Sequence, residues 1–372
     1  MVRYPLGGML SWVLQFLVGF KRLGHEIYFV EKAGYPNSCY NPTNETMSDD
    51  CTYGVAVLDK LLASLGLENT WCFVDQSENY YGISKKDMEE IFRTADIFID
   101  MGTHGSWEHE AVNSTLKVLI DGEPAFTQIK MVNSLNSGIN LPRYDHYFTT
   151  GKNIGTEYSI SPTAGIAWKY LYHPVQVDMF PVTPCPENAF YSTVMNWQSH
   201  QPIEYNGKKY GQKNLEFQKF IDLPMQVSIP MQVAVAGKKL PIDILKKKGW
   251  DVVDAKQETS SFDAFCNYIQ QSRGEFSVCK NVFVANQSGW FSDRSAAYLA
   301  SGRPVVMQDT GFSRHLPCGE GLFAFHTLDE AKAAIEKIES DYELHSKTAR
   351  QIACEYLDTR IVLKAFLKDL GI

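Results

Sequence analysis

The segment from Gly289 to Gly311, GWFSDRSAAYLASGRPVVMQDTG, constrains the fold more than any other part of the chain. Ser292 and Asp293 stand where a helix N-cap is expected, before an alanine-rich helix that Gly302 ends. Residues 304–307 then form an apolar run typical of a strand buried in a parallel sheet. A loop, a helix, a strand and a second loop in this order predict an α/β fold that binds its ligand at the carboxyl ends of the strands.

The start of this helix is a candidate phosphate site. Its first amide groups and the positive end of the helix dipole favour a bound anion, and Arg294 could pair bidentately with phosphate oxygens. Asp309, Thr310 and Gly311 follow the buried strand at its carboxyl end. We therefore expect a phosphate-bearing ligand at these two loops.

This stretch resembles the donor half of GT-B glycosyltransferases, in particular the family-4 or group 1 enzymes, whose motif runs roughly E-A-hydrophobic-A-x-G-x-P-V-V and then D-x-G-G. The resemblance implies two Rossmann-like, doubly wound domains facing across a cleft. It also implies transfer of a sugar from a UDP- or GDP-linked donor to a hydroxyl acceptor, which could be a glycan, a lipid-linked glycan or a small molecule. In such sites amide dipoles and cationic side chains stabilise the leaving group, so we expect no metal and no cofactor beyond the nucleotide sugar.

The resemblance also assigns roles to two charged residues. Lys213 in YGQKNLEF matches the basic residue that neutralises the donor diphosphate, although it could be a solvated surface lysine. Glu275 in SRGEFSVCK matches the acidic residue that contacts sugar hydroxyls from the loop before the donor helix, or it could pair with Arg273 at the surface. The donor-binding set expected from the resemblance is Lys213, Glu275, Ser292, Asp293, Arg294, Asp309, Thr310 and Gly311.

The chain departs from the family at its glutamates. The retaining enzymes space two glutamates eight residues apart, and Ala297 occupies the place of the second one. Asp293, one helical turn earlier, could take the ribose-binding role. Two alternatives stay open: a nucleotide-sugar epimerase of the same fold, and a catalytically silent nucleotide-sugar-binding protein.

The N-terminal half repeats a strand-and-helix rhythm. Gly7 and Gly8 open an amphipathic helix over 9–23 before a strand over 25–30, which resembles the first βαβ unit of a GT-B acceptor domain and makes the two glycines an acceptor-side loop. The preceding strand is expected to be short, within 1–4, or missing. Further elements expected are helices at 53–65 and 84–94 and strands at 71–75, 97–100, 117–120 and 147–149.

A general base for an inverting reaction would lie on this half. His104 and Asp121 follow strands at their carboxyl ends and are the acceptor-side catalytic candidates, with Glu275 as the catalytic candidate on the donor side. His146 and Glu123 are weaker choices.

Prolines 174, 181, 184 and 186 mark a domain boundary. We expect an acceptor domain over 1–175, a donor domain over 187–357 and a terminal helix over 358–372 that crosses back to the first domain. Within the second half the pattern predicts strands at 190–195, 231–236 and 251–255 and helices at 214–223, 241–248, 262–271, 328–340 and 341–356.

Composition excludes several other classes. The chain of 372 residues is 44% apolar and 21% charged with a net charge of −8, which disfavours nucleic-acid binding and adhesion to anionic lipid. The most apolar stretch, 9–20, is too short to span a membrane, which needs ~20 apolar residues. The eight cysteines are scattered without a CxxC pair, which favours free thiols in a reducing, cytoplasmic protein.

Overall fold

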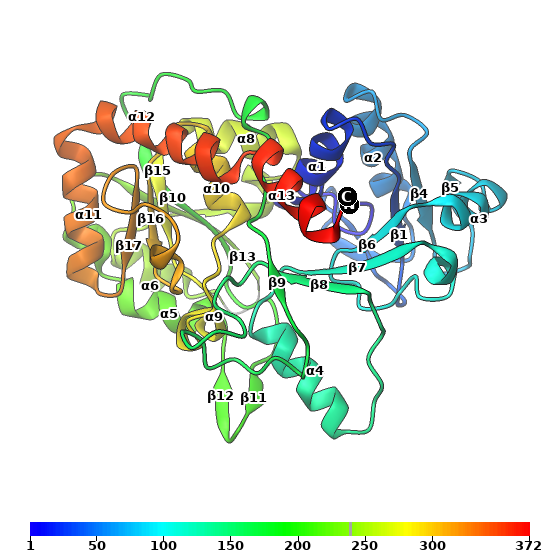
Figure 1. The fold of residues 1–372 in the computed structure, drawn as a ribbon. Coiled ribbons are helices and arrows are strands. Elements are labelled where there is room, and N and C mark those ends of the chain that lie inside the picture. Colours follow the sequence, from blue (N-terminus) through cyan, green and yellow to red (C-terminus); the bar gives the residue numbers. More distant parts are fainter. Residues whose placement is uncertain (238–239) are drawn as a thin grey trace.

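The computed structural model describes residues 1–237 and 240–372, and it contains two α/β halves that lie side by side (Figure 1). The first half, blue to green, holds a three-stranded sheet, a four-stranded sheet and a two-stranded hairpin, and the second half, green to orange, holds one six-stranded sheet and a second hairpin. The α/β class and the pair of Rossmann-like halves predicted from the sequence are confirmed.

The large sheet is parallel throughout, with the strand order β14-β13-β10-β15-β16-β17. Numbered along the chain this is the order 3-2-1-4-5-6 of a Rossmann fold, in which the strand order reverses between β10 and β15. Ligands of such sheets bind at that reversal, outside the carboxyl ends of the strands. The six strands are β10 (Phe190–Asn196), β13 (Met231–Ala236), β14 (Asp251–Asp254), β15 (Ser272–Ser277), β16 (Val305–Gln308) and β17 (Leu322–Phe325).

Some helices of the second half begin at side-chain caps. Ser261 accepts a hydrogen bond from the amide of Ala264, and Thr327 forms a capping box with Glu330. These helices are α5 (Lys213–Phe217), α6 (Ile242–Lys247), α7 (Ala255–Glu258), α8 (Phe262–Gln271), α9 (Asn281–Ala285), α10 (Asp293–Ala300), α11 (Leu328–Ser340) and α12 (Tyr342–Ile352). A hairpin of β11 (Ile203–Tyr205) and β12 (Lys208–Tyr210) precedes α5.

The first half contains a parallel sheet, β6-β7-β8-β9, and a sheet β1-β4-β5 in which β5 is antiparallel. Its strands are β1 (Phe29–Lys32), β2 (Cys39–Asn41), β3 (Thr46–Ser48), β4 (Trp71–Val74), β5 (Tyr80–Gly82), β6 (Ile97–Asp100), β7 (Leu116–Asp121), β8 (His146–Thr149) and β9 (Lys169–Tyr170). Its helices are α1 (Gly7–Arg22), α2 (Thr52–Ser64), α3 (Lys85–Thr94) and α4 (Phe126–Asn136).

Several element predictions need correction. The strand expected over 25–30 is β1, four residues later. Residues 1–4, where a short or missing strand was expected, form no strand, and the carbonyl of Arg3 accepts the amide of Tyr40. The helix expected over 214–223 stops at Phe217 and continues as 3-10 turns. The helix expected over 341–356 gives way to a π-helical turn over Ala353–Leu357. Amphipathic periodicity alone does not distinguish these tighter or wider turns from an α-helix.

The last helix, α13 (Thr359–Leu370), lies against α1 at the centre of the molecule (Figure 1). The ring of Phe366 lies 6.0 Å from Phe20 of α1 and 4.8 Å from Phe148 of β8. Gly19 permits this approach, because a Cβ there would lie 2.5 Å from Leu363. The C-terminal end of the chain therefore packs on the first half, while the domain bounds proposed from the sequence stay a prediction.

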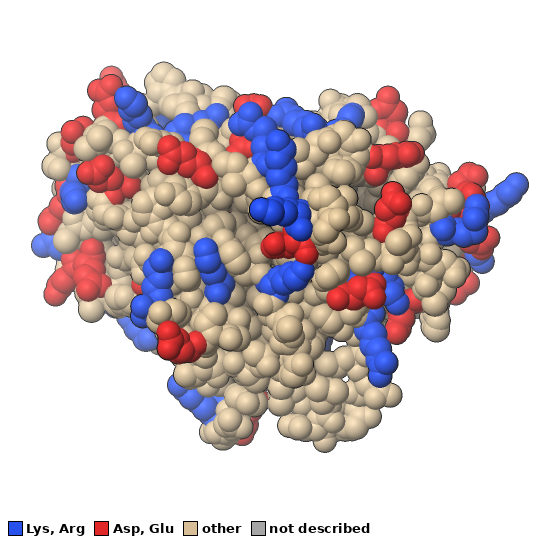
Figure 2. Space-filling model, viewed as in Figure 1, with Lys and Arg blue, Asp and Glu red and all other residues tan. Residues whose placement is uncertain are grey.

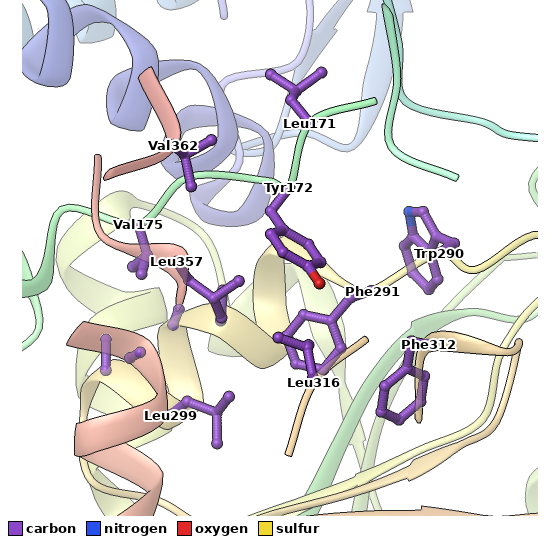
Figure 3. Packing of buried hydrophobic residues seen from close by; sticks show 14 of the residues in the cluster. Leu171, Tyr172, Val175, Trp290, Phe291, Leu299, Phe312, Leu316, Leu357 and Val362 are labelled. Carbon is purple, nitrogen blue, oxygen red and sulfur yellow. The ribbon is translucent and has the colours of Figure 1, made fainter. Parts of the chain in front are cut away.

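One hydrophobic cluster runs through both halves. Figure 3 shows Tyr172, from the segment after β9, reaching onto Phe291 and Leu316 of the second half.

Among the helices formed by the described residues, none has the length and apolar composition of a membrane-spanning segment. On the face seen in Figure 2 acidic and basic residues are interspersed, so no broad patch of one sign covers that face.

Candidate active site

Lys213 lies at the reversal point of the large sheet. The β11–β12 hairpin returns the chain to the carboxyl end of β10, and α5 begins at Lys213, which is 8% exposed. Its ammonium makes no hydrogen bond to any described residue. Burial, reinforced by the nearby charge of Arg294, lowers the pKa of Lys213 to about 7. This lysine is therefore not the solvated surface residue of the alternative interpretation.

Glu275 and Arg294 form a buried ion pair beside it. The Arg294 Nε lies 2.5 Å from Glu275 Oε1, and its Nη2 donates to the Ser277 hydroxyl at 2.8 Å. The expectation that Glu275 lies in a loop is wrong, because it is fully buried within β15. The alternative pairing with Arg273 is also wrong, since Arg273 binds Glu339 at 2.7 Å. The sequence RGEF did not reveal the pairing because the two partners lie nineteen residues apart.

Two cations and two carboxylates meet here. Glu275 acts on both Lys213 and Arg294, and Asp293 acts on Arg294 as well. The lowered pKa of Lys213 reflects the cost of burying a charged ammonium that has no hydrogen-bonded partner among the described residues. An anion bound next to Lys213 would offset that cost, so the site is suited to a negatively charged ligand.

The start of α10 adds backbone donors to this cluster. Ser292 is the N-cap residue, as expected, but its side chain makes no capping hydrogen bond, and Asp293 is the first helical residue. The first amides of a helix have no partner within the helix. Because Arg294 belongs to the same turn, the helix terminus and the cationic cluster face a common region.

The loop after β16 is held internally. Asp309 accepts hydrogen bonds from the Gly311 amide at 2.8 Å and the Ser313 hydroxyl at 2.6 Å, and Thr310 donates to the carbonyl of Trp290 at 2.6 Å. These contacts fix the loop against the segment before α10. A direct contact of this loop with the donor stays a prediction.

Asn153 of the first half lies between the loop before α10 and the loop after β16. No motif in the sequence indicated this contact. The Asn153 side chain donates to the carbonyl of Gln287 at 3.0 Å and bonds with His315 at 2.7 Å. A Cβ on Gly289 would lie 2.7 Å from its backbone nitrogen, and one on Gly311 2.5 Å from its side-chain nitrogen. Both glycines also have positive φ, which side chains disfavour. Asn153 can therefore pack against these two loops only because positions 289 and 311 carry no side chain.

The acceptor-side candidates differ in their surroundings. Asp121 is buried, and its two oxygens accept hydrogen bonds from the Glu123 amide, Gln128 and Thr149 at 2.8–2.9 Å. His104 has a positive φ of 53° and no hydrogen-bond partner in the described residues, and burial lowers its pKa. Geometry thus makes Asp121 a fixed element of the turn and leaves the ring of His104 free.

Of the two glycines expected as an acceptor-side loop, only Gly8 is open. A Cβ on Gly7 would lie 2.2 Å from the carbonyl of Ser261, and the Gly7 amide donates to Thr259 at 2.7 Å. A Cβ on Gly8 would meet nothing within 4 Å. Both residues are the first of α1, so no separate glycine loop precedes this helix.

Two sets of contacts at the junction of the halves were not predicted from the sequence. His173, which follows β9, lies between Trp12 of α1 and Trp290, with ring centroids 6.4 Å apart on each side. Glu123, one of the weaker candidates, forms an ion pair with Lys280 across the junction at 2.5 Å. A lone histidine and scattered tryptophans carry no spacing signal, so only the fold brings them together.

Comparison with known proteins identifies the fold. No protein-family model and no curated protein matches the chain. Solved structures that resemble it include an alpha-glucosyltransferase in complex with UDP and a 13-mer DNA containing a HMU base. That structure has a TM-score of 0.60 at 11% identity and matches 99% of this chain and 97% of its own.

Two further solved structures are similar. AviGT4, a glycosyltransferase involved in avilamycin A biosynthesis, has a TM-score of 0.55 at 11% identity over 98% of this chain and 89% of its own. HepE of Anabaena in complex with UDP-glucose has a TM-score of 0.52 at 12% identity over 93% and 99%. The chain thus has the GT-B fold of these glycosyltransferases along almost its whole length.

Proposed function

We propose that this protein is a glycosyltransferase that moves a sugar from a nucleotide-diphosphate sugar to a hydroxyl acceptor without a metal ion. The observation that carries the proposal is the buried cluster of Lys213, Arg294 and Glu275 at the strand reversal of the large sheet. UDP and UDP-glucose in the similar solved structures indicate the kind of donor.

Each member of the cluster has a distinct proposed role. Lys213 and the free donors of Arg294 contact the diphosphate oxygens and stabilise the charge that develops as the bond to the anomeric carbon breaks. The first amides of α10 add dipoles of the same sign. Glu275 fixes the guanidinium through Nε, so that Arg294 is already oriented when the donor arrives.

The acceptor proton requires a separate group. His104 is the proposed base if the reaction inverts the anomeric centre, because its imidazole has no competing hydrogen bond among the described residues. Asp121 stays a candidate, but three donors already occupy its oxygens.

One observation favours the catalytically silent alternative. Ala297 stands in the place of the second glutamate of the retaining family members, and it is 1% exposed within the hydrophobic cluster. A binding protein would retain nucleotide-sugar affinity without transfer, whereas an epimerase would convert the donor sugar without releasing UDP or GDP.

The experiment separates these functions. Isothermal titration with UDP, GDP, UDP-glucose and GDP-mannose identifies the nucleotide, and release of UDP or GDP is then measured across a panel of hydroxyl acceptors. Arg294→Ala should weaken nucleotide binding by about 1.5–3 kcal/mol, the scale of a charged hydrogen bond. Arg93→Ala is the matched control, since that arginine is 63% exposed on α3.

An unchanged dissociation constant in Arg294→Ala would show that the diphosphate binds elsewhere. Binding without acceptor-dependent release of nucleotide on any acceptor would favour the silent alternative.

A further inference from the structure

A cavity of about 310 Å³ lies in the first half, on α3. Every residue that lines it belongs to 80–113, and most come from α3 and from the 3-10 turn η1 (Glu110–Asn113), which packs against α3. Figure 1 shows α3 at the edge of the first half that faces away from the second half. The volume is at the lower end of the roughly 300–1,000 Å³ typical of ligand pockets, so the cavity suits a small ligand.

The wall of this cavity is largely aromatic and apolar. Lys85, Met88 and Phe92 recur at helical spacing, so one face of α3 forms this wall. Trp107 is 2% exposed, and its ring lies 5.4 Å from that of Phe92. Tyr80 of β5 adds a third aromatic ring. Ligand sites commonly combine such surfaces with a few polar groups that fix the orientation of the ligand.

Two polar atoms of the lining residues are buried without a hydrogen-bond partner. They are the indole Nε1 of Trp107 and the carboxylate Oε2 of Glu110. Lys32 holds the other oxygen of this carboxylate at 2.5 Å, and its ammonium lies 4.2 Å from the centre of the Trp107 ring. One lysine therefore fixes both side chains and leaves each with one unused polar atom. Burying such atoms unpaired is unfavourable, so a ligand that pairs with them is stabilised.

The two unused atoms require different partners. The indole N–H of Trp107 can only donate, and the ionised carboxylate of Glu110 can only accept. A phosphate or a carboxylate would pair with Trp107 alone, and an ammonium would pair with Glu110 alone. A hydroxyl group both donates and accepts, so a ring with several hydroxyls satisfies both atoms. Lysine and arginine side chains equal the acidic ones in number along the cavity, which also favours an uncharged ligand.

We propose that this cavity is a carbohydrate-binding site for one neutral sugar unit, separate from the donor site. The proposal does not rest on the proposed transferase function, because every lining residue belongs to the first half. Sugar bound here adds to occupation of the donor site and does not compete with it.

Saturation-transfer NMR on the full chain tests this with glucose, galactose, mannose, N-acetylglucosamine, maltose and cellobiose at millimolar concentration. At least one of these sugars should bind saturably, and excess UDP or GDP should not displace it. Glu110→Gln puts an amide in place of the accepting carboxylate, and Trp107→Phe keeps an aromatic ring without the N–H. Each should weaken binding of that sugar several-fold. Glu68→Gln is the matched control, since it makes the same change at an exposed glutamate and should bind the sugar as the wild type does.

Three results would overturn the proposal: no binding of any of these sugars, displacement of the bound sugar by UDP or GDP, or wild-type affinity in both Glu110→Gln and Trp107→Phe. None of them bears on nucleotide binding, which the Arg294→Ala titration tests separately. Far-UV circular dichroism and thermal unfolding establish that each variant is folded. If Trp107→Phe is not folded, Glu110→Gln decides alone, because unchanged sugar affinity in that variant contradicts the proposal.

Discussion

Donor affinity should depend on the protonation of Lys213. Burial holds its pKa near 7 in the free protein, against a usual value of 10.5. A diphosphate next to the ammonium favours the charged form, so the pKa must rise on binding. Lys213 therefore takes up a proton when donor binds above pH 7, and binding weakens as pH rises through 7.

The magnitude follows from the two pKa values. If the pKa in the complex stays above about 9, the bound lysine stays protonated, and the affinity follows the fraction of free protein in which Lys213 is protonated. Between pH 6 and pH 8 that fraction falls about tenfold, which weakens binding by about 1.4 kcal/mol. The diphosphate of UDP-glucose has no terminal phosphate that titrates in this range, so UDP-glucose is a better probe than UDP.

Titration calorimetry at several pH values, in buffers of different ionisation enthalpy, measures both the affinity and the proton uptake. Lys213→Met should bind weakly with no pH dependence from this residue, and Lys209→Met, which changes an exposed lysine of the nearby hairpin, should retain the wild-type profile. A wild-type affinity that is flat from pH 6 to pH 8, or a slope that persists in Lys213→Met, would refute the reasoning.

Three further predictions concern stability, metals and motion. Gly7→Ala should lower the unfolding free energy, measured in urea, by about 1–3 kcal/mol, because its Cβ would meet the carbonyl of Ser261. Gly8→Ala should leave the unfolding free energy nearly unchanged, and equal losses of stability in the two variants would contradict the packing argument. Turnover should survive EDTA, since cations of the protein are proposed to stabilise the leaving group, and a complete loss that Mg²⁺ or Mn²⁺ restores would show otherwise. Deleting residues 359–372 should reduce turnover more than nucleotide affinity, because α13 packs on α1 and β8 and not on the donor cluster. The truncated protein must first be shown to fold, and equal losses of turnover and affinity would contradict this prediction.

The donor half was more predictable from sequence than the acceptor half. The helix over Phe262–Gln271 and the strand over Met231–Ala236 have the predicted bounds, because caps and apolar runs are local signals. In the first half β1 was misplaced by four residues, and the β2–β3 hairpin was missed, since its short strands are partly exposed.

The candidate site shows the same limit. Arg294 and Lys213 could be proposed because they stand next to a helix start, whereas the Glu275 pairing, the entry of Asn153 and the Trp12–His173–Trp290 cluster depend on contacts between distant segments. A single sequence carries no signal for such contacts unless the residues are spaced in a recognised motif.

The insertion of Asn153 also bears on the glutamates that this chain lacks. Counting eight residues back from Ala297 gives Gly289, so a pair of glutamates at the retaining spacing that ends at 297 would need one at this position. A side chain at 289 would collide with the backbone of Asn153 and Lys152, and one at 297 would extend into the hydrophobic cluster. Substituting both positions with glutamate would therefore not recover a retaining site but would separate the loop of one half from the other. The packing of residues 151–153 against this loop therefore limits which side chains position 289 can carry.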